Sequence, residues 1–381
     1  MTVELRGVTW EHERGHDSIV AAGEEYATQH PEVSLRWDAR SLQSFADQPL
    51  EQLANEYDLL VIDHPHVAGA ASAGLLEPLD SRLPPELDDD AFVGGSHASY
   101  RHRGRQFGLA TDAAAQVSAH RPDLLGSPPE TWSEVLELAA EGRVLWPAKP
   151  IDAFSSLVTV IAQGGGDVMT PEGVFARHED VDRAWELLLA LTASVPRRCL
   201  SMNPIQVAEE LSSGTQHAYS PLLFGYTNYS RPGYRPHLLH YRDIPVAHEG
   251  DVPRGALLGG AGIAVSASSG VKEEAVRFAV WLAGSDAQRG RYFDAGGQPG
   301  HSDAWNDGRL DAATSGFFSG TRRTLENATV RPAHPRFITF QDTASLLVAE
   351  GLADRASASS VADALNDLFA GLHEGDHDAD R

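Results

Sequence analysis

The stretch that decides the fold is residues 255–288, GALLGGAGIAVSASSGVKEEAVRFAVWLAGSDAQ. It joins a glycine-rich strand, a polar turn and an amphipathic helix. Gly259, Gly260 and Gly262 interrupt an otherwise apolar strand, and glycine inside a strand marks a bend or the close approach of a ligand or another backbone. We therefore expect function at this approach, around Gly260 and Ala261.

Length and composition predict a globular protein with two lobes. The chain has 381 residues and a mass of 41.0 kDa, which exceeds the size at which a single hydrophobic core keeps growing. Two lobes would leave a cleft between them. The formal net charge of −24, from 54 acidic and 30 basic residues, repels the phosphates of nucleic acid and anionic membrane surfaces. Nucleic acid is therefore excluded as a partner.

Cysteine content and the first residues bear on the cellular compartment. Cys199 is the single cysteine of the sequence, so the fold cannot depend on an internal disulfide. The residues after Met1 show neither the basic region nor the apolar region of a secretory signal. We expect an extracytoplasmic protein if the sequence is a trimmed mature form, and a cytoplasmic one if Met1 is the native start. No apolar run is long enough to predict a membrane span.

The first part of the chain alternates strand and helix patterns. Strands are expected over 3–10, 33–37 and 57–62, with helices over 18–29 and 49–55 between them. The last of these strands is a continuous apolar run, which is typical of a buried parallel strand. This order predicts an α/β lobe that begins with a βαβαβ unit.

The middle of the chain is richer in helix patterns. The segment 128–140 has Thr131 at the N-cap position and Glu134 three residues later, which is the signature of a capping box. Further elements are expected as helices over 153–163, 181–194 and 203–213, strands over 105–112, 144–146, 217–223 and 256–265, and two closing helices within 337–372. This distribution predicts a second, helix-rich lobe.

Three crossings between the lobes are expected, near residue 111, near residue 255 and between 305 and 335. Lobe 1 would comprise residues 1–111 and 255–305, lobe 2 would comprise residues 112–254 and 306–372, and residues 373–381 would form a disordered acidic tail. Ligands of open α/β sheets bind beyond the carboxyl ends of the strands. Residues that directly follow a strand are therefore the first candidates for a site.

The first candidate site follows the strand over 3–10. The sequence HERGH at 12–16 matches the zinc-protease pattern H-E-x-x-H, in which both histidines lie one turn apart in a helix. Gly15 lies between His12 and His16, and the helical period starts only near Ser18, so we interpret the segment as a strand-to-helix loop. Two other interpretations stand beside the metal site: a ligand-binding loop in which Trp10 and His12 contact the solute, and a solvated loop without a specific role.

The next strand ends at Asp63-His64-Pro65-His66, where proline prevents a simple helical continuation. Asp63 and His64 could hydrogen-bond a polar ligand, Asp63 could cap a helix, or the histidines could hold a metal. The last option leads to an alternative function, a metal-dependent hydrolase or lyase. Its metal ligands would be the histidine cluster His12, His16, His64 and His66.

The other candidates lie on the first crossing and in the second lobe. Asp112 could accept hydrogen bonds from ligand hydroxyls or cap a helix. Tyr226, Asn228 and Tyr229 form an aromatic and polar cluster that suits a sugar ring, although such a loop can also be packing. Trp146 is a similar case. The nucleophile elbow, the P-loop and the dinucleotide fingerprint are absent from the sequence, so we expect neither nucleophilic catalysis nor a cofactor.

Several motifs occur in the order found in family 1 extracellular solute-binding proteins, the sugar-type receptors of ABC importers, which this chain resembles. The motifs are YDLLVID (57–63), GLLEPLD (74–80), FGLATDAAAQV (107–117), PPETWSEVLELA (128–139), the stretch 255–288, GGQPGHSDAW (296–305) and PRFITFQDTASLLVAEGL (335–352). The resemblance implies an α/β fold of the periplasmic-binding-protein type II, with two discontinuous lobes and a hinge. It also implies a monomeric protein without enzymatic activity that closes on a small polar solute. The solute would be a sugar, a polyol or a small carboxylic acid, passed to an ABC permease.

Overall fold

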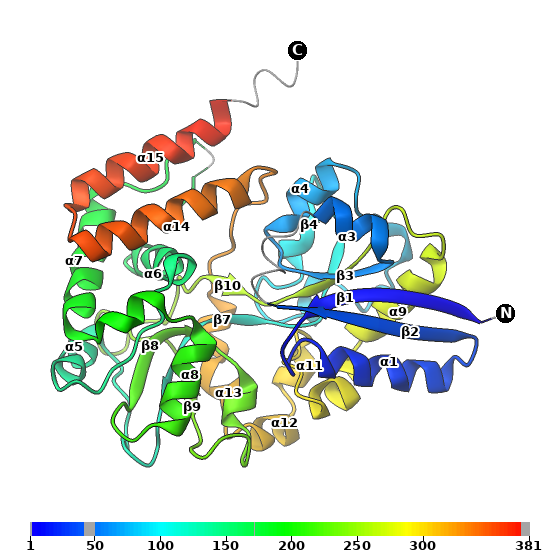
Figure 1. Ribbon diagram of the computed structural model, residues 1–381, viewed down its shortest axis with the longest axis horizontal. Coiled ribbons are helices and arrows are strands. Elements are labelled where there is room, and N and C mark those ends of the chain that lie inside the picture. The colour runs from blue at the N-terminus through cyan, green and yellow to red at the C-terminus, as the bar shows by residue number, and fades with distance from the viewer. Residues whose placement is uncertain (1, 42–49, 171, 375–381) are drawn as a thin grey trace. The chain divides into compact units, whose positions relative to one another are not determined.

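The computed structural model describes residues 2–41, 50–170 and 172–374. Contacts within the chain divide it into two compact units, each built from separate segments (Figure 1). Unit 1 comprises Met1–Ala114, Gly259–Ala313 and Ala333–Pro335. Unit 2 comprises Ala115–Leu258, Thr314–Pro332 and Arg336–Arg381. The short return to unit 1 at residues 333–335 has no counterpart among the segments expected from the sequence.

Unit 1 contains a five-stranded sheet in the order β2-β1-β3-β11-β6. Its strands are β1 (Val3–Trp10), β2 (Val33–Arg40), β3 (Leu59–Ile62), β6 (Gly108–Ala110) and β11 (Gly262–Val265), and β4 (Arg101–His102) pairs separately with β5 (Arg105–Gln106). Its α-helices are α1 (Asp17–Gln29), α3 (Leu50–Glu56), α4 (His66–Ser72), α9 (Lys272–Ala283), α10 (Ser285–Ala287), α11 (Ser302–Trp305) and α12 (Gly308–Ala313). Shorter helical turns are η1 (Asp80–Arg82), η2 (Asp89–Ala91), η3 (Ala98–Tyr100) and η6 (Gln288–Tyr292).

Helices α1 and α9 lie on one face of this sheet (Figure 1). Aromatic side chains pack the two helices and the sheet together. Phe278 of α9 lies with its ring centroid 5.2 Å from that of Tyr26 in α1 and 6.1 Å from that of Trp37 in β2. The Trp37 ring covers Gly7 of β1, where a Cβ atom would lie only 2.2 Å from the ring. The amphipathic helix of the stretch 255–288 therefore buries its apolar face against the sheet, at β11, β6 and β1, and meets the first helix of the chain through Phe278 and Tyr26.

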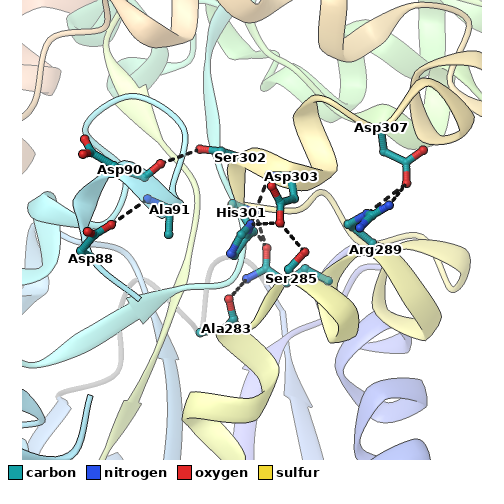
Figure 2. Close-up of polar contacts among 12 residues, drawn as sticks. Asp88, Asp90, Ala91, Ala283, Ser285, Arg289, His301, Ser302, Asp303 and Asp307 are labelled. Carbon is teal, nitrogen blue, oxygen red and sulfur yellow. Dashed lines mark hydrogen bonds and ion pairs between the residues drawn. The ribbon is translucent and has the colours of Figure 1, made fainter. Parts of the chain in front are cut away.

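Segment 285–301 is tied into unit 1 by a buried glutamine, whose partners include Ala283 and His301, both labelled in Figure 2. Gln288 donates its side-chain amide to the carbonyl oxygens of Ala110 at 3.0 Å and Ala283 at 3.3 Å. Its side-chain oxygen accepts from the backbone N–H groups of Gly300 at 2.7 Å and His301 at 2.8 Å. A buried amide that makes all of these bonds leaves no uncompensated polar atom and holds three segments in place.

Unit 2 contains a smaller sheet and most of the long helices. Its sheet has the order β10-β7-β8, with β9 paired to β7: the strands are β7 (Ala114–His120), β8 (Tyr219–Phe224), β9 (His240–Arg242) and β10 (Leu258–Gly259). The helices are α5 (Trp132–Ala140), α6 (Pro150–Gln163), α7 (His178–Ser194), α8 (Pro204–Ser213), α13 (Phe317–Glu326), α14 (Phe337–Asp354) and α15 (Ala358–Glu374), with the turns η4 (Arg197–Ser201) and η5 (Thr227–Ser230).

Four phenylalanine rings join the helices of unit 2. Phe340 of α14 lies 5.0 Å from Phe369 of α15 and 6.0 Å from Phe154 of α6, between ring centroids. Phe175, which precedes α7, contacts Phe154 at 6.0 Å and Phe369 at 6.4 Å. Such edge-to-face and tilted pairs add to the stabilisation from burial. The two closing helices expected within 337–372 are confirmed, and they run side by side (Figure 1).

A chain of buried hydrogen bonds connects α6 to β7 and to the segment before β10. Ser156 accepts from Trp146 Nε1 and from Gln116 Nε2, both at 3.1 Å. Thr159 donates to Gln116 Oε1 at 2.5 Å and accepts from the backbone N–H of Leu257 at 2.9 Å. All five residues are buried. Polar groups in a core are tolerated when they are paired in this way, and the pairing fixes one arrangement of the segments.

Several expected elements differ in the structure. The strand expected over 256–265 is broken into β10 and β11 by Gly260, whose φ of +102° no extended strand has. The strand expected over 105–112 is likewise divided between β5 and β6. At 144–146 only an isolated bridge from Val144 to Tyr219 forms. The capping box of Thr131 and Glu134 is confirmed at the start of α5.

Two further expectations concern the chain ends and the helices. A disordered tail was expected over 373–381, but residues 373 and 374 belong to α15, and residues 375–381 lie outside the described residues. Residue 49 of the helix expected over 49–55 also lies outside the described residues. Within residues 2–41, 50–170 and 172–374, no helix combines the length and the apolar character needed to cross a membrane. Cys199 is buried, and burial raises the pKa of its thiol.

His97 makes the stability of unit 1 depend on pH. Its ring is 1% exposed and stacks on Phe92, with centroids 4.3 Å apart and planes 8° from parallel. Neither ring nitrogen has a hydrogen-bond partner among the described residues. Burial, helped by the charge of Arg101, lowers the pKa of His97 to about 4 against the raising effect of Asp89 and Asp88.

In the unfolded chain His97 takes up a proton near pH 6.5, whereas in the folded chain it does so only near pH 4. The free energy of unfolding therefore falls as pH decreases from about 6.5 to about 4. We expect this one group to change the free energy of unfolding by about 3 kcal/mol over that range. His97→Phe keeps a ring on Phe92 and is expected to flatten the pH dependence of the unfolding free energy, measured by urea denaturation. His120 in unit 2, whose pKa burial also lowers to about 4, should contribute independently in a His120→Phe variant. An unchanged pH dependence in His97→Phe would contradict this account.

Candidate functional site

The strand order of unit 1 brings distant segments to one edge of the sheet. β1 runs parallel to β3, with Val8 opposite Leu60, so the residues that follow both strands emerge at the same edge. β11 is antiparallel to its two neighbours, and Gly262 lies opposite Ile62 of β3 and Ala110 of β6. The residues before β11 and after β6 therefore reach that edge as well. The predicted site residues that the structure gathers here are Trp10, His12, Asp63, His64, Asp112, Gly260 and Ala261.

The loop between β1 and α1 has a defined conformation. The backbone N–H of Arg14 donates to Nδ1 of His12 at 3.0 Å, and the N–H of Gly15 donates to the His12 carbonyl at 2.9 Å. Gly15 lies against the ring of Trp10, where a Cβ atom would come within 2.3 Å. The helix α1 begins at Asp17. The interpretation of HERGH as a strand-to-helix loop is therefore confirmed, and the two histidines do not share a helix.

Arg14 and Asp112 form a buried, bidentate ion pair. Arg14 Nε donates to Asp112 Oδ2 at 2.6 Å, and an Nη atom donates to Oδ1 at 2.5 Å. The side chains are 5% and 1% exposed. Burial raises the pKa of the Asp112 carboxyl, against the lowering effect of the guanidinium, and Asp63 raises it further. Both oxygens of Asp112 are thus engaged within the protein. The alternative of a helix cap is wrong, because the strand β7 follows this residue.

Asp63 and His64 follow β3 directly. Asp63 is half-buried, and its carboxylate lies near enough to Asp112 to influence it electrostatically. The helix α4 has Pro65 at its N-cap and no side-chain cap, so the capping alternative for Asp63 is not what the structure shows. His64 is buried, with its ring edge-on to Tyr100 at 6.3 Å.

The structure does not assemble the histidine cluster into a metal site. Among the described residues, no group of three or more His, Cys, Asp or Glu side chains is placed to hold a metal ion. His16 instead contacts the neighbouring Asp17, with Nδ1 and Oδ1 2.9 Å apart. The metal interpretation of His12, His16, His64 and His66 therefore lacks the geometry it needs.

Gly260 and Ala261 pair with the segment that carries Asp112. The N–H of Asp112 donates to the carbonyl of Ala261 at 2.9 Å, and the N–H of Ala261 donates back to the carbonyl of Asp112 at 3.2 Å. Gly260 has φ +102°, and a Cβ atom there would lie 2.5 Å from the Asp112 carbonyl oxygen. The glycine-rich break thus permits the close approach of another backbone, one of the two roles expected from the sequence.

The aromatic cluster of unit 2 follows β8. Tyr229 is 1% exposed, and its hydroxyl donates to Glu209 Oε1 at 2.7 Å, which makes it a packed core residue. Tyr226 is half-buried. Asn228 is also 1% exposed, and its Oδ1 accepts no hydrogen bond from the described residues. Trp146 belongs to the buried polar chain described above and is 0% exposed, so it presents no ring face to solvent.

Two residues of this region were not found from the sequence. Arg14 lies inside the HERGH segment, but its partner is 98 positions further along the chain, and no local pattern announces such a pair. Gln298 is fully buried and donates to the carbonyl of Ala113 at 2.8 Å, while the N–H of Ala113 donates back to the Gln298 carbonyl at 3.3 Å. It therefore holds the chain at the point where unit 1 ends.

The chain is similar to a known protein family and to several solved structures. The model of one family, described as bacterial extracellular solute-binding protein, matches residues 21–307. Maltose-bound MalE3 of T. maritima is 18% identical and has a TM-score of 0.82, over 97% of this chain and all of that one.

Two other solved structures are similar. The GacH receptor of Streptomyces glaucescens GLA.O is 16% identical over 98% of this chain and 99% of its own, with a TM-score of 0.80. An ABC transporter solute-binding protein from Agrobacterium radiobacter K84, in complex with ribitol, is 20% identical over 97% and 98%, with a TM-score of 0.81. At these identities the likeness shows the fold, and it confirms the expected α/β fold of two-lobed periplasmic binding proteins.

Gly260→Ala should disrupt the edge at which these segments meet. The new Cβ atom would require a backbone conformation that alanine avoids and would overlap the Asp112 carbonyl. We expect a loss of about 2 kcal/mol or more in unfolding free energy, measured by urea denaturation. Gly270→Ala is the matched control, because a Cβ atom there would have no neighbour within 4 Å and the φ of Gly270 is not positive. The control should change stability by less than about 1 kcal/mol. Equal effects of the two substitutions would contradict this role for Gly260.

Proposed function

Because the chain belongs to the bacterial extracellular solute-binding proteins, we propose that its solute is a small carbohydrate or polyol. The observation that carries this proposal is the gathering of Trp10, His12 and Asp63 at the carboxyl edge of the unit 1 sheet. This edge is where ligands of open α/β sheets bind.

The polar groups at this edge suit hydroxyl groups. Because Nδ1 of His12 accepts the N–H of Arg14, the neutral ring carries its proton on Nε2 and acts there as a donor. Asp63 provides acceptor oxygens. A hydroxyl both donates and accepts, so a polyhydroxyl solute can satisfy the two side chains together. The negative charge of Asp63, in a chain of net charge −24, favours a neutral solute over an anionic one.

Unit 2 has predicted site residues of its own, and their groups also suit a sugar or polyol. The half-buried ring of Tyr226 can pack against the apolar face of a sugar. The buried amide of Asn228, whose Oδ1 has no partner among the described residues, provides a further acceptor for a hydroxyl. Tyr229 supports this loop through Glu209 and does not itself need to contact the solute.

The relatives support the same solute class. MalE3 of T. maritima was solved with maltose and the Agrobacterium protein with ribitol, one a sugar and the other a polyol. We extend the proposal to delivery of the solute to an ABC permease by a protein outside the cytoplasm, because the family is described as extracellular and the Agrobacterium protein as part of an ABC transporter. We propose further that the protein acts as a monomer.

The alternative of a metal-dependent hydrolase or lyase is not supported. The family is one of binding proteins, and the four histidines named for the metal are not arranged as its ligands among the described residues. No specific observation favours a second function.

A thermal-shift screen tests the proposed solute class. Maltose and ribitol, with further sugars and polyols, form one arm, and small carboxylic acids form the other. A solute that binds only the folded protein raises the melting temperature, and a concentration of 100 times Kd stabilises by about 2.7 kcal/mol. We expect a rise with at least one sugar or polyol and none with the acids. A shift confined to the acids, or none in either arm, would overturn the proposal.

Substitutions at the sheet edge test the site itself. Asp63→Ala and His12→Ala each remove one hydrogen-bonding partner, and we expect the affinity for the solute found in the screen to fall roughly tenfold or more, measured by calorimetry. Asp286→Ala is the control for a lost carboxylate, because Asp286 is exposed on α10. Wild-type affinity in both site variants would show that the solute binds elsewhere.

A further inference from the structure

The ion pair between Arg14 and Asp112 joins the candidate ligand loop to the segment through which the chain leaves unit 1. Arg14 belongs to the loop between β1 and α1, and Asp112 lies two residues before Ala114, the last residue of this part of unit 1. The two side chains are buried and are joined by two hydrogen bonds. Burying two charges is costly, and removing one partner leaves the other uncompensated. A buried pair of this kind therefore fixes the Arg14 loop against the Asp112 segment, which an exposed ion pair would not do.

The loop has its own internal bonds around Arg14. The carbonyl of Arg14 accepts from Ser18 Oγ at 2.6 Å, and the carbonyl of Gly15 accepts from Thr9 Oγ1 at 3.0 Å. The N–H of Arg14 is the donor that His12 Nδ1 accepts. The position of the Arg14 backbone therefore decides which nitrogen of His12 carries the proton.

The other end of the pair is held just as firmly. Asp112 exchanges two backbone hydrogen bonds with Ala261 and forms a bridge with Pro299. Its carboxylate is consequently a fixed point to which a guanidinium can attach in one orientation. Lysine offers a single point charge and cannot reproduce this two-pronged attachment.

We propose that Arg14 is a positioning residue for the solute site: by anchoring its loop on Asp112, it holds His12 as an Nε2–H donor. This inference rests on the proposed function for its consequence in binding, but the state of His12 can be measured without any solute. Arg14 itself needs no contact with the solute. The Arg14 side chain fixes the conformation of the loop, and the loop in turn holds the His12 imidazole as a donor for the solute.

The test without solute uses ¹⁵N NMR of the histidine rings in the full-length protein, with His12→Gln to assign the signals. Above the ordinary pKa of histidine, we expect wild-type His12 to show an unprotonated Nδ1 and a protonated Nε2. In Arg14→Lys, the two nitrogens should move toward the averaged shifts of mixed tautomers. A wild-type ring protonated on Nδ1, or an Arg14→Lys spectrum identical to wild type, would overturn the inference.

The test with solute is a double-mutant cycle measured by calorimetry with the best sugar or polyol of the screen. Arg14→Lys is expected to weaken binding roughly tenfold, as His12→Ala does, and the double variant should be little weaker than either single one. Additive losses would show that Arg14 does not act through His12. If the wild-type protein binds no member of the screen, the proposed function fails, while the NMR result still decides the role of Arg14.

Arg121→Lys separates positioning from a general loss of stability. Arg121 is also buried and also grips a carboxylate with two hydrogen bonds, to Asp123 at 2.8 and 2.7 Å, but it belongs to unit 2 and supports the carbonyls of Leu211 and Gly214. Its lysine variant should lose stability yet keep the solute affinity and the His12 spectrum of wild type. If Arg121→Lys changes them as much as Arg14→Lys does, the effect is not specific to the loop and the inference fails.

Discussion

The antiparallel insertion of β11 between β3 and β6 is the constraint on which unit 1 depends. This strand enters the sheet about 150 positions after the residues of the first crossing that it pairs with. Without it, β6 would lose its partner in the sheet and β3 would be paired only to β1, which would leave buried backbone groups without the hydrogen bonds that a core requires. Its insertion also carries the backbone of Ala261 to Asp112. The arrangement of the candidate site is thus a direct result of sheet pairing.

Charge and backbone geometry act together at this edge. Gly260 lets two backbones approach more closely than any side chain would allow, and Asp112 is thereby fixed where Arg14 can reach it. From the sequence, Asp112 was a candidate for contact with a solute, but its carboxylate is bonded to Arg14 inside the protein. Asp63, which is half-buried, is the other carboxylate at this edge. The protein separates an internal, structural acid from one that can face a polar solute, although both follow strands of the same sheet.

Elements with local causes could be predicted from the sequence, and features with distant causes could not. The capping box at Thr131 depends on contacts three residues apart, so its pattern was sufficient. The break at Gly260 was also visible, because glycine in an apolar strand has few explanations. By contrast, the partner of Arg14 lies far along the chain, and a tryptophan such as Trp146 looks the same in sequence whether its ring is buried or exposed. For the candidate site, the strand ends were predictable and the hydrogen-bonding state of each side chain was not.

Because each unit is built from separate segments of the chain, the order of synthesis limits when each unit can fold on the ribosome. The N-terminal sheet stays incomplete until β11 has been synthesised, and the phenylalanine cluster of unit 2 needs Phe369 from the last described helix. Neither unit can therefore finish folding while a large part of the chain is still missing, and both must close long loops to do so. Exposed strand edges and apolar helix faces persist during that interval, and such surfaces are the ones that make incompletely folded chains prone to aggregate.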